Sequence, residues 1–145
     1  MKRVLLAFVA IAMLASYAAG QTAKRRAVKT GPPNGIFSPA IITGDLVYTS
    51  GQIGIDSKTG QLAEGFEAQL EQVFKNLEAV LEASGSSIDH VVKATVFLAD
   101  MNEYNKLNEL YPKKFKGDPP ARTTVQVARL PRDARVEIEV VAVVK

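Results

Sequence analysis

Alternating hydrophobic and polar positions predict two strands early in the body of the chain. Residues 36–42 and 46–53 are rich in β-branched and aromatic residues. The Thr-Gly-Asp segment at 43–45 has the length and composition of a hairpin turn, and a second turn signal follows at 56–60. We therefore expect an antiparallel hairpin at the start of the folded part.

The clearest helix signal lies between Phe66 and Leu81. Hydrophobic side chains recur there at i, i+4, i+7, i+8, i+11, i+14 and i+15, which places them on one face of a helix. Charged residues occupy the other faces, and Gly85 is a typical helix terminator. The hydrophobic face requires a sheet to pack against.

The second half of the chain predicts a strand at 90–98, a second helix and two further strands. Asp100 and Glu103 form a D-x-x-E capping signature for that helix, and Pro112 breaks or kinks its end. The helix carries its apolar side chains at four positions: Tyr104, Leu107, Tyr111 and Phe115. Residues 123–128 and 135–144 alternate as strands, which could pair as a hairpin about residues 130–133.

These elements predict one α+β domain, with about six strands and two helices on one face of the sheet. The other face is not purely polar, since valines alternate with polar residues in the last two strands: Val125, Val127, Val141 and Val143. A sheet that is apolar on both faces favours packing against another copy of the chain.

Composition excludes several classes of chemistry. The chain has no cysteine and one histidine, His90, so it has no disulfide framework, no thiol nucleophile and no cysteine-ligated metal. The formal net charge of +3 comes from the N-terminus, where the first 29 residues hold six basic and no acidic residues. From residue 30 onward, 12 basic residues face 15 acidic ones, so the body carries −3.

The N-terminus resembles an export signal. Residues 1–20 have a basic start, a 12-residue apolar run and a small-residue exit with plausible cleavage after Ala18 or Gly20. This pattern predicts a periplasmic or secreted protein, the alternative being a buried N-terminal helix. Residues 21–34 are polar and basic and predict a flexible arm. The arm is a solvated linker or, alternatively, a patch for RNA or anionic lipid.

Arg122 and Glu137 are the main chemical candidates. Arg122 opens a strand directly after Pro119-Pro120-Ala121, and a guanidinium at such a rigid junction can bind a carboxylate through two parallel hydrogen bonds. Glu137 lies on the next strand, from which it could reach the Arg122 side of the sheet or the site of a neighbouring copy. The alternative is an ordinary ion pair on the strand surface.

Several segments resemble the RidA (YjgF) family in the correct order. They are SPAIITGDLVYTSGQIGID, VVKATVFLADMNEYNKLNELY and PARTTVQVARLPRDARVEIEVVAV, so the resemblance spans essentially residues 35–144. It implies a chorismate-mutase-like fold with a six-stranded mixed sheet, a domain at residues 35–145, and a homotrimer with ligand clefts between subunits. It also implies hydrolysis of reactive 2-enamine and 2-imine acids to 2-ketoacids and ammonia, with no cofactor and no metal.

The resemblance also assigns roles to individual residues. Arg122 would bind the substrate carboxylate, and Glu137 would position water or relay a proton. The remaining substrate contacts would come from five positions: Phe37, Ser50, Gly51, Asn108 and Thr124.

Two departures from the family pattern affect the predicted cleft. Residues 35–39 read Gly-Ile-Phe-Ser-Pro where members often have Gly-Pro-Tyr-Ser-Gln, so Phe37 lacks a hydroxyl and Pro39 lacks a backbone donor. The loop between Tyr111 and Arg122 is also shorter than in typical members. An apolar Phe37 predicts a preference for larger or more apolar substrate side chains.

Three functional classes follow from the sequence. The first is an exported imine deaminase, and the second is a non-catalytic module that binds small carboxylate metabolites in the same clefts. The third is a nucleic-acid or ribonuclease role, which the acidic body disfavours. We expect as partners a small 2-imino or 2-keto acid and further copies of the chain, with no nucleic acid, and no membrane once the signal is removed.

Overall fold

The computed structural model describes residues 24–30 and 35–145. The predicted signal peptide at 1–20, with its cleavage sites at Ala18 and Gly20, lies outside the described residues. So does part of the predicted arm, at 21–23 and 31–34.

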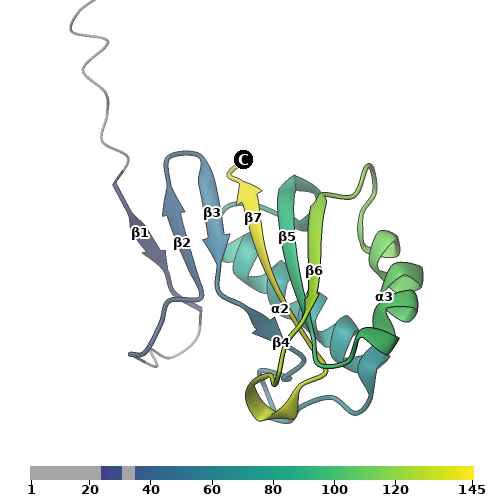
Figure 1. Cartoon of the computed structure of the whole chain (residues 1–145). Coiled ribbons are helices and arrows are strands. Elements are labelled where there is room, and N and C mark those ends of the chain that lie inside the picture. The colour runs from purple at the N-terminus through teal and green to yellow at the C-terminus, as the bar shows by residue number, and fades with distance from the viewer. Residues whose placement is uncertain (1–23, 31–34) are drawn as a thin grey trace, which may run out of the picture.

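The described chain forms one mixed sheet with helices on one side (Figure 1). The strands are β1 (Arg26–Val28), β2 (Ala40–Thr43), β3 (Leu46–Thr49), β4 (Gln52–Ile53), β5 (Val91–Leu98), β6 (Ala121–Gln126) and β7 (Val136–Val143). The α-helices are α2 (Phe66–Ala83) and α3 (Tyr104–Leu110), and short 3-10 turns lie at Ile88–His90, Met101–Glu103, Tyr111–Lys114 and Pro131–Asp133. The strand order is β1-β2-β3-β7-β5-β6, with β4 also paired to β7. The predicted α+β class and the two helices are confirmed.

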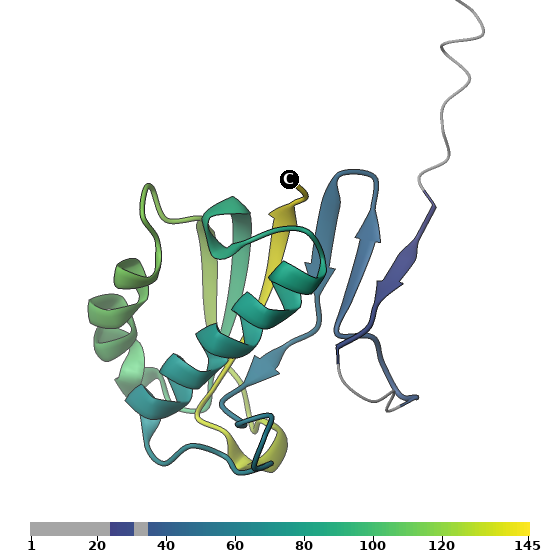
Figure 2. The same cartoon turned by 180° about the vertical axis from the view of Figure 1, so that it is seen from behind.

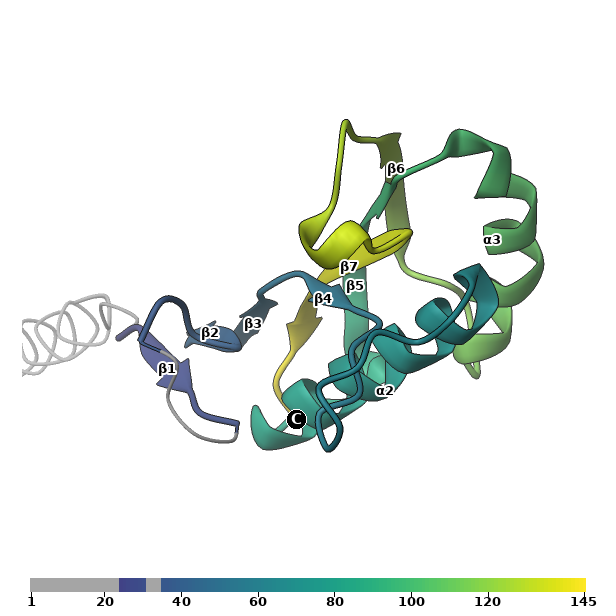
Figure 3. The ribbon, with the colours of Figure 1, turned by 90° about the horizontal axis from the view of Figure 1, so that it is seen from below.

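The core lies between α2 and the sheet, as Figure 2 shows from behind. Leu70, Val73 and Leu77 on α2 are at most 1% exposed, and they belong to the same buried cluster as Val96 and Ile138 on the central strands. The hydrophobic spacing predicted from the sequence is therefore the buried face of the helix. Figure 3 shows α3 on the same side as α2, next to β6.

The last two strands do not form the hairpin that the sequence suggested. β5 lies between them, running antiparallel to β7 and parallel to β6. The connection from β5 to β6 contains α3, and a crossover of this kind is what parallel neighbours require. The segment between β6 and β7 is long enough to pass β5, so proximity in sequence did not dictate pairing.

Three predicted boundaries also differ. Residues 26–28, assigned to the flexible arm, form β1 and pair with β2, because a β-branched and basic segment can extend a sheet edge. The first predicted strand begins only at Ala40, and the second breaks at Ser50–Gly51 into β3 and β4. The end of the second helix agrees with the prediction instead, since the helix ends at Leu110 and continues as a 3-10 turn containing Pro112.

The face of the sheet away from α2 keeps apolar side chains at its surface. Tyr48 is 44% exposed and Val125 is 39% exposed, while Val141 and Val143 are half-buried. We call this surface the open face. A cavity of about 190 Å³ lies on it, with Tyr48, Lys93 and Glu139 among its lining residues.

Candidate functional site

Arg122 is held by three neutral groups from the α3 region. One of its terminal guanidinium nitrogens donates to Asn108 Oδ1 at 2.5 Å. Its guanidinium carbon lies 4.8 Å from the centre of the Tyr111 ring and 5.6 Å from that of Tyr104. Aromatic faces attract the cation without neutralising it. The arrangement orients the guanidinium while leaving its charge available.

Arg122 has no carboxylate partner among the residues that the structure describes. Neighbouring basic residues differ in this respect, since Arg129 pairs with Asp133 and Arg135 pairs with Glu103. A half-buried guanidinium without a counter-ion is suited to an external anion, and its fork of N–H groups matches a carboxylate. The predicted alternative, a surface ion pair between Arg122 and Glu137, is not what the described residues form.

Two buried hydroxyl groups in this region have no hydrogen-bond partner in the described structure. They are the Tyr111 phenol and the Thr124 hydroxyl. Burial raises the pKa of Tyr111 to about 12, although the Arg122 charge opposes the rise, so this phenol stays protonated. Thr124 follows Arg122 by two positions on the same strand, so both side chains point to one face. The Thr124 hydroxyl therefore lies on the same side of the sheet as Arg122.

Glu137 occupies a different environment. Its pKa is raised above the usual 4.5, first by burial and then by the charge of Glu139. Its carboxylate has no hydrogen bond and no ion pair with any residue in the described ranges. Gly51 makes room for it, since a Cβ atom at Gly51 would lie 1.8 Å from Glu137 Oε1. The missing side chain at Gly51 is therefore what lets the carboxylate lie against the backbone.

Ser50 fixes the loop that carries Phe37. The Ser50 hydroxyl donates to the Ser38 carbonyl at 2.7 Å, and the Ser50 N–H donates to the Pro39 carbonyl at 2.9 Å. Phe37, one residue before Ser38, is 59% exposed. An aromatic ring therefore stands at the surface of a loop that is bonded directly to the residue preceding Gly51.

The predicted site residues form two groups on opposite faces of the sheet. Arg122 pairs with Ala94, which pairs with Val140, so these side chains share the helix-covered face. Glu137 lies three positions from Val140 along β7, which places its side chain on the open face. Arg122, Asn108 and Thr124 make one half-site, and Glu137, Gly51 and Ser50 make the other. Within one chain the structure does not bring the halves together.

Sequence reasoning missed the role of two tyrosines. The sequence placed Tyr104 and Tyr111 among the apolar side chains of the second helix. Tyr111 is indeed buried, but both rings also contact the Arg122 guanidinium. Their spacing of i and i+7, with Asn108 at i+4, is the signal that could have placed all three on one side of α3.

Within residues 24–30 and 35–145 there is no group of three or more His, Cys, Asp or Glu side chains that could hold a metal ion. In the same ranges no helix combines the length and apolar character needed to cross a membrane.

Comparison with known proteins identifies the family. The sequence profile of the family described as Endoribonuclease L-PSP, which includes the RidA proteins, matches residues 28–144. The chain belongs to this family. The match includes every predicted site residue and begins at Val28, the last residue of β1.

Several RidA relatives are similar over most of their length. The human protein named 2-iminobutanoate/2-iminopropanoate deaminase is 43% identical over 123 residues, which cover 82% of this chain and 90% of the relative. The crystal structure of RidA from an Antarctic Psychrobacter has a TM-score of 0.75 at 42% identity, with 86% and 100% of the two chains covered. The structure of Escherichia coli TdcF with bound serine has a TM-score of 0.77 at 32% identity, covering 83% of this chain and 99% of that one.

Proposed function

We propose that the protein hydrolyses reactive 2-imino acids and their 2-enamine tautomers to 2-ketoacids and ammonia. The observation that carries this proposal is Arg122, a half-buried guanidinium with neutral neighbours and no carboxylate partner in the described structure. The deaminase name of the human relative supports the choice of substrate class.

Arg122 binds the substrate carboxylate, and the Thr124 hydroxyl gives a further polar contact. Water adds to the C=N carbon of the protonated imine to form a carbinolamine, and a proton moves from the added oxygen to the nitrogen. The C–N bond then breaks and ammonia leaves. The C=O bond forms as the remaining hydroxyl proton is lost to water, from which the ammonia takes it up as ammonium. Glu137 accepts the proton from the attacking water and returns it to the nitrogen, a role that suits a carboxyl group whose pKa is raised toward neutrality.

A complete site requires a second copy of the chain. Arg122 and Glu137 lie on opposite faces, so the two half-sites meet only where one copy places its helix-covered edge against the open face of another. Exposed Tyr48 and Val125 on the open face support such a contact. We propose a homotrimer in which each cleft combines Arg122, Asn108 and Thr124 of one copy with Glu137, Ser50 and Gly51 of the next.

Phe37 sets the preference among substrates in this proposal. Its exposed ring is joined through Ser38 and Ser50 to the half-site of Glu137. An aromatic wall without a hydroxyl favours apolar substrate side chains, so the imines of leucine or phenylalanine are expected to react faster than that of alanine.

The deciding experiment compares wild type with Arg122→Ala in an imine hydrolysis assay, with an amino acid oxidase generating the imine in place. Wild type is expected to form 2-ketoacid faster than the spontaneous rate. Arg122→Ala is expected to lose at least about 100-fold in kcat/KM, because an anchored carboxylate is lost and the reacting carbon is no longer oriented. Thermal unfolding and oligomeric state serve as controls for folding. Equal rates of the two proteins with several imino acids would refute the proposal.

A non-catalytic binding module is the second candidate. The solved TdcF structure is described with bound serine, a small carboxylate metabolite, and Phe37 removes a hydroxyl from the cleft. This candidate predicts that 2-ketoacids raise the Tm in a saturable manner, while imine hydrolysis stays at the spontaneous rate.

Two further expectations accompany the proposal. The signal-like pattern of residues 1–20 supports export to the periplasm or the medium, which cell fractionation can test. The family description names an endoribonuclease, but the body from residue 30 carries −3 and disfavours a polyanion. We therefore propose a small-molecule substrate and no nucleic-acid partner.

A further inference from the structure

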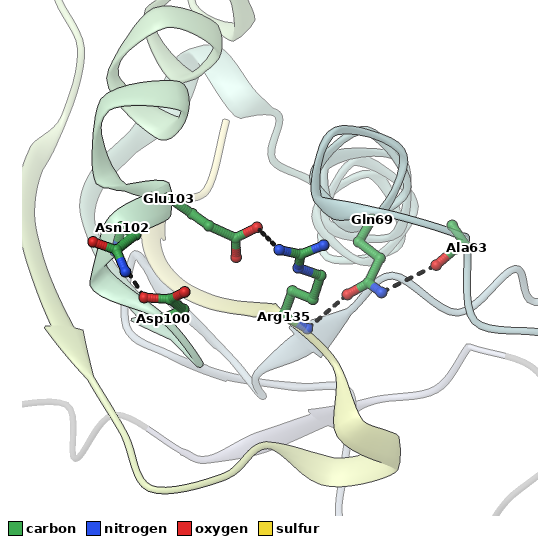
Figure 4. A network of polar contacts seen from close by, with 6 residues as sticks. All are labelled: Ala63, Gln69, Asp100, Asn102, Glu103 and Arg135. Atoms are coloured by element: carbon green, nitrogen blue, oxygen red, sulfur yellow. Dashed lines mark hydrogen bonds and ion pairs between the residues drawn. The ribbon is translucent and has the colours of Figure 1, made fainter.

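Arg135, directly before β7, is bonded to three other elements, and Figure 4 shows its contacts with Glu103 and Gln69. Its guanidinium lies 2.5 Å from Glu103 Oε1, and its backbone N–H donates to Gln69 Oε1 at 2.7 Å. Its carbonyl accepts from the N–H of Ala99 at 3.0 Å. Arg135 therefore connects β7 to the start of α3, to α2 and to the end of β5.

Gln69 extends these connections to the segment after β4. This side chain belongs to a residue only 4% exposed, and its Nε2 donates to the Ala63 carbonyl at 3.0 Å. The Ala63 N–H in turn donates to the Gly54 carbonyl at 2.9 Å. Gly54 lies so close to α2 that a Cβ atom there would be 2.6 Å from the Gln69 Cα.

Glu103 does not play the local role that its spacing from Asp100 predicted. In a capping box its carboxylate would fold back toward the backbone of Asp100. Asp100 does accept from the Asn102 N–H at 2.9 Å, but Glu103 turns to Arg135 instead. Its side chain is 11% exposed, so the ion pair is largely buried on the Glu103 side.

Both residues of the Glu103–Arg135 ion pair lie next to residues of the proposed site. Glu103 directly precedes α3, whose Tyr104 and Asn108 contact Arg122. Arg135 lies two positions before Glu137. The network therefore spans the two half-sites that one chain contributes.

We propose that Glu103 and Arg135 are positioning residues. Their ion pair fixes α3, which contacts Arg122, relative to β7, which carries Glu137. The inference rests on the proposed function, since it concerns the same two half-sites. Because each half-site faces a different neighbour in the assembly, a shift of α3 against β7 misaligns the clefts on both sides of the subunit.

The energetics fit positioning better than stabilisation. Burial raises the pKa of Glu103 even though Arg135 opposes the rise, so desolvation outweighs the attraction. The second Glu103 oxygen is buried without a partner in the described structure. Two apolar side chains could pack at this position without a desolvation cost, whereas an ion pair holds its two residues in one relative geometry.

The test replaces Arg135 by Met and by Lys, with Arg129→Met as the matched control. Arg129 also forms an ion pair, at 2.6 Å to Asp133, but that pair is exposed and stays within the loop between β6 and β7. Arg135→Met is expected to raise KM for the 2-imino acid by about tenfold, since a misplacement of ~1 Å can cost ~100-fold in rate. Arg135→Lys, which can still reach Glu103, is expected to recover most of the loss.

Hydrogen exchange separates positioning from general destabilisation. Arg135→Met is expected to speed exchange in residues 104–111 and 136–139 well below its Tm, and Arg129→Met to leave both segments unchanged. An unchanged KM in Arg135→Met, with only a lower Tm, overturns the inference. If wild type shows no hydrolysis, the proposed function fails. The dissociation constant for 2-oxobutanoate then replaces KM: a raised value in Arg135→Met sustains the inference and an unchanged value overturns it.

Discussion

Arg122 and Glu137 lie in the same sheet, but their surroundings differ. The guanidinium of Arg122 has two aromatic rings and an amide oxygen around it, all from one short stretch of chain. The carboxylate of Glu137 has no bonding partner in the described residues and fits over a glycine. A binding group gains from a fixed orientation, whereas a proton carrier needs a shifted pKa and a free oxygen. The difference therefore matches the two proposed roles.

The largest effect is expected from separating the two half-sites altogether. Val125→Asp places a charge on the open face and should yield folded monomers with no activity above the spontaneous rate, because neither half-site has its complement. Sedimentation and the imine assay measure the two consequences. Glu78→Lys, on the exposed side of α2, should leave both unchanged. A fully active monomer would show that one chain suffices.

Glu137→Gln tests only the half-site that is proposed to transfer the proton. We expect kcat to fall by about 100-fold with KM little changed, as is typical for loss of an acid–base group.

The raised pKa of Glu137 also has a consequence for stability. The stability that Glu137 contributes is present below the ordinary pKa of a glutamate. It is lost as the pH rises through the pKa that Glu137 has in the folded state. As the pH is raised above 4.5, the Tm of wild type should therefore fall more than that of the Glu137→Gln variant, as measured by calorimetry. Equal losses would contradict this assignment.

Gly51→Ala displaces the Glu137 carboxylate without removing it. The new Cβ would lie 1.8 Å from Glu137 Oε1, and this oxygen ends a flexible side chain that can move aside. Stability should change little, while kcat should fall by about tenfold because the carboxylate is misplaced. The double variant with Glu137→Gln should be no slower than Glu137→Gln alone. Additive losses would mean that Gly51 acts independently of Glu137.

Tyr104→Leu is expected to have the smallest effect, and it acts on the binding half. Loss of an aromatic face 5.6 Å from the guanidinium carbon should raise KM by about two- to fivefold, the range for a partly exposed cation–π contact. Tyr104→Phe keeps the ring and should match wild type in steady-state kinetics. A similar rise in KM for both variants would assign the effect to the hydroxyl instead.

The sequence predicted the parts of the fold that depend on periodicity. The buried face of α2, the β2–β3 turn and the alternation of β7 all follow from spacing, and the structure confirms them. The pairing of β6 with β5 rather than with β7 did not follow, because a connection of several residues can close a hairpin or cross a strand. The hairpin assumption left open which face of the sheet Glu137 occupies relative to Arg122.

The sequence pointed to candidate site residues more readily than to the contacts between them. The family pattern pointed to Arg122, Asn108 and Thr124, which the structure places on one half-site. The bond between Glu103 and Arg135 joins residues 32 positions apart. No local pattern indicates such a pair, because it depends on how the loops after β5 and β6 pack together.

The position of β7 has a consequence for the order of events during synthesis. β7 is the most C-terminal strand of the described chain, yet it is the one that joins β3 and β4 to β5. While the ribosome makes the chain, α2 and the earlier strands therefore emerge without the central strand that completes their core. Residues 1–20 predict an export signal. For an exported chain, a core that is completed only by the last strand would keep the polypeptide unfolded until translocation has begun.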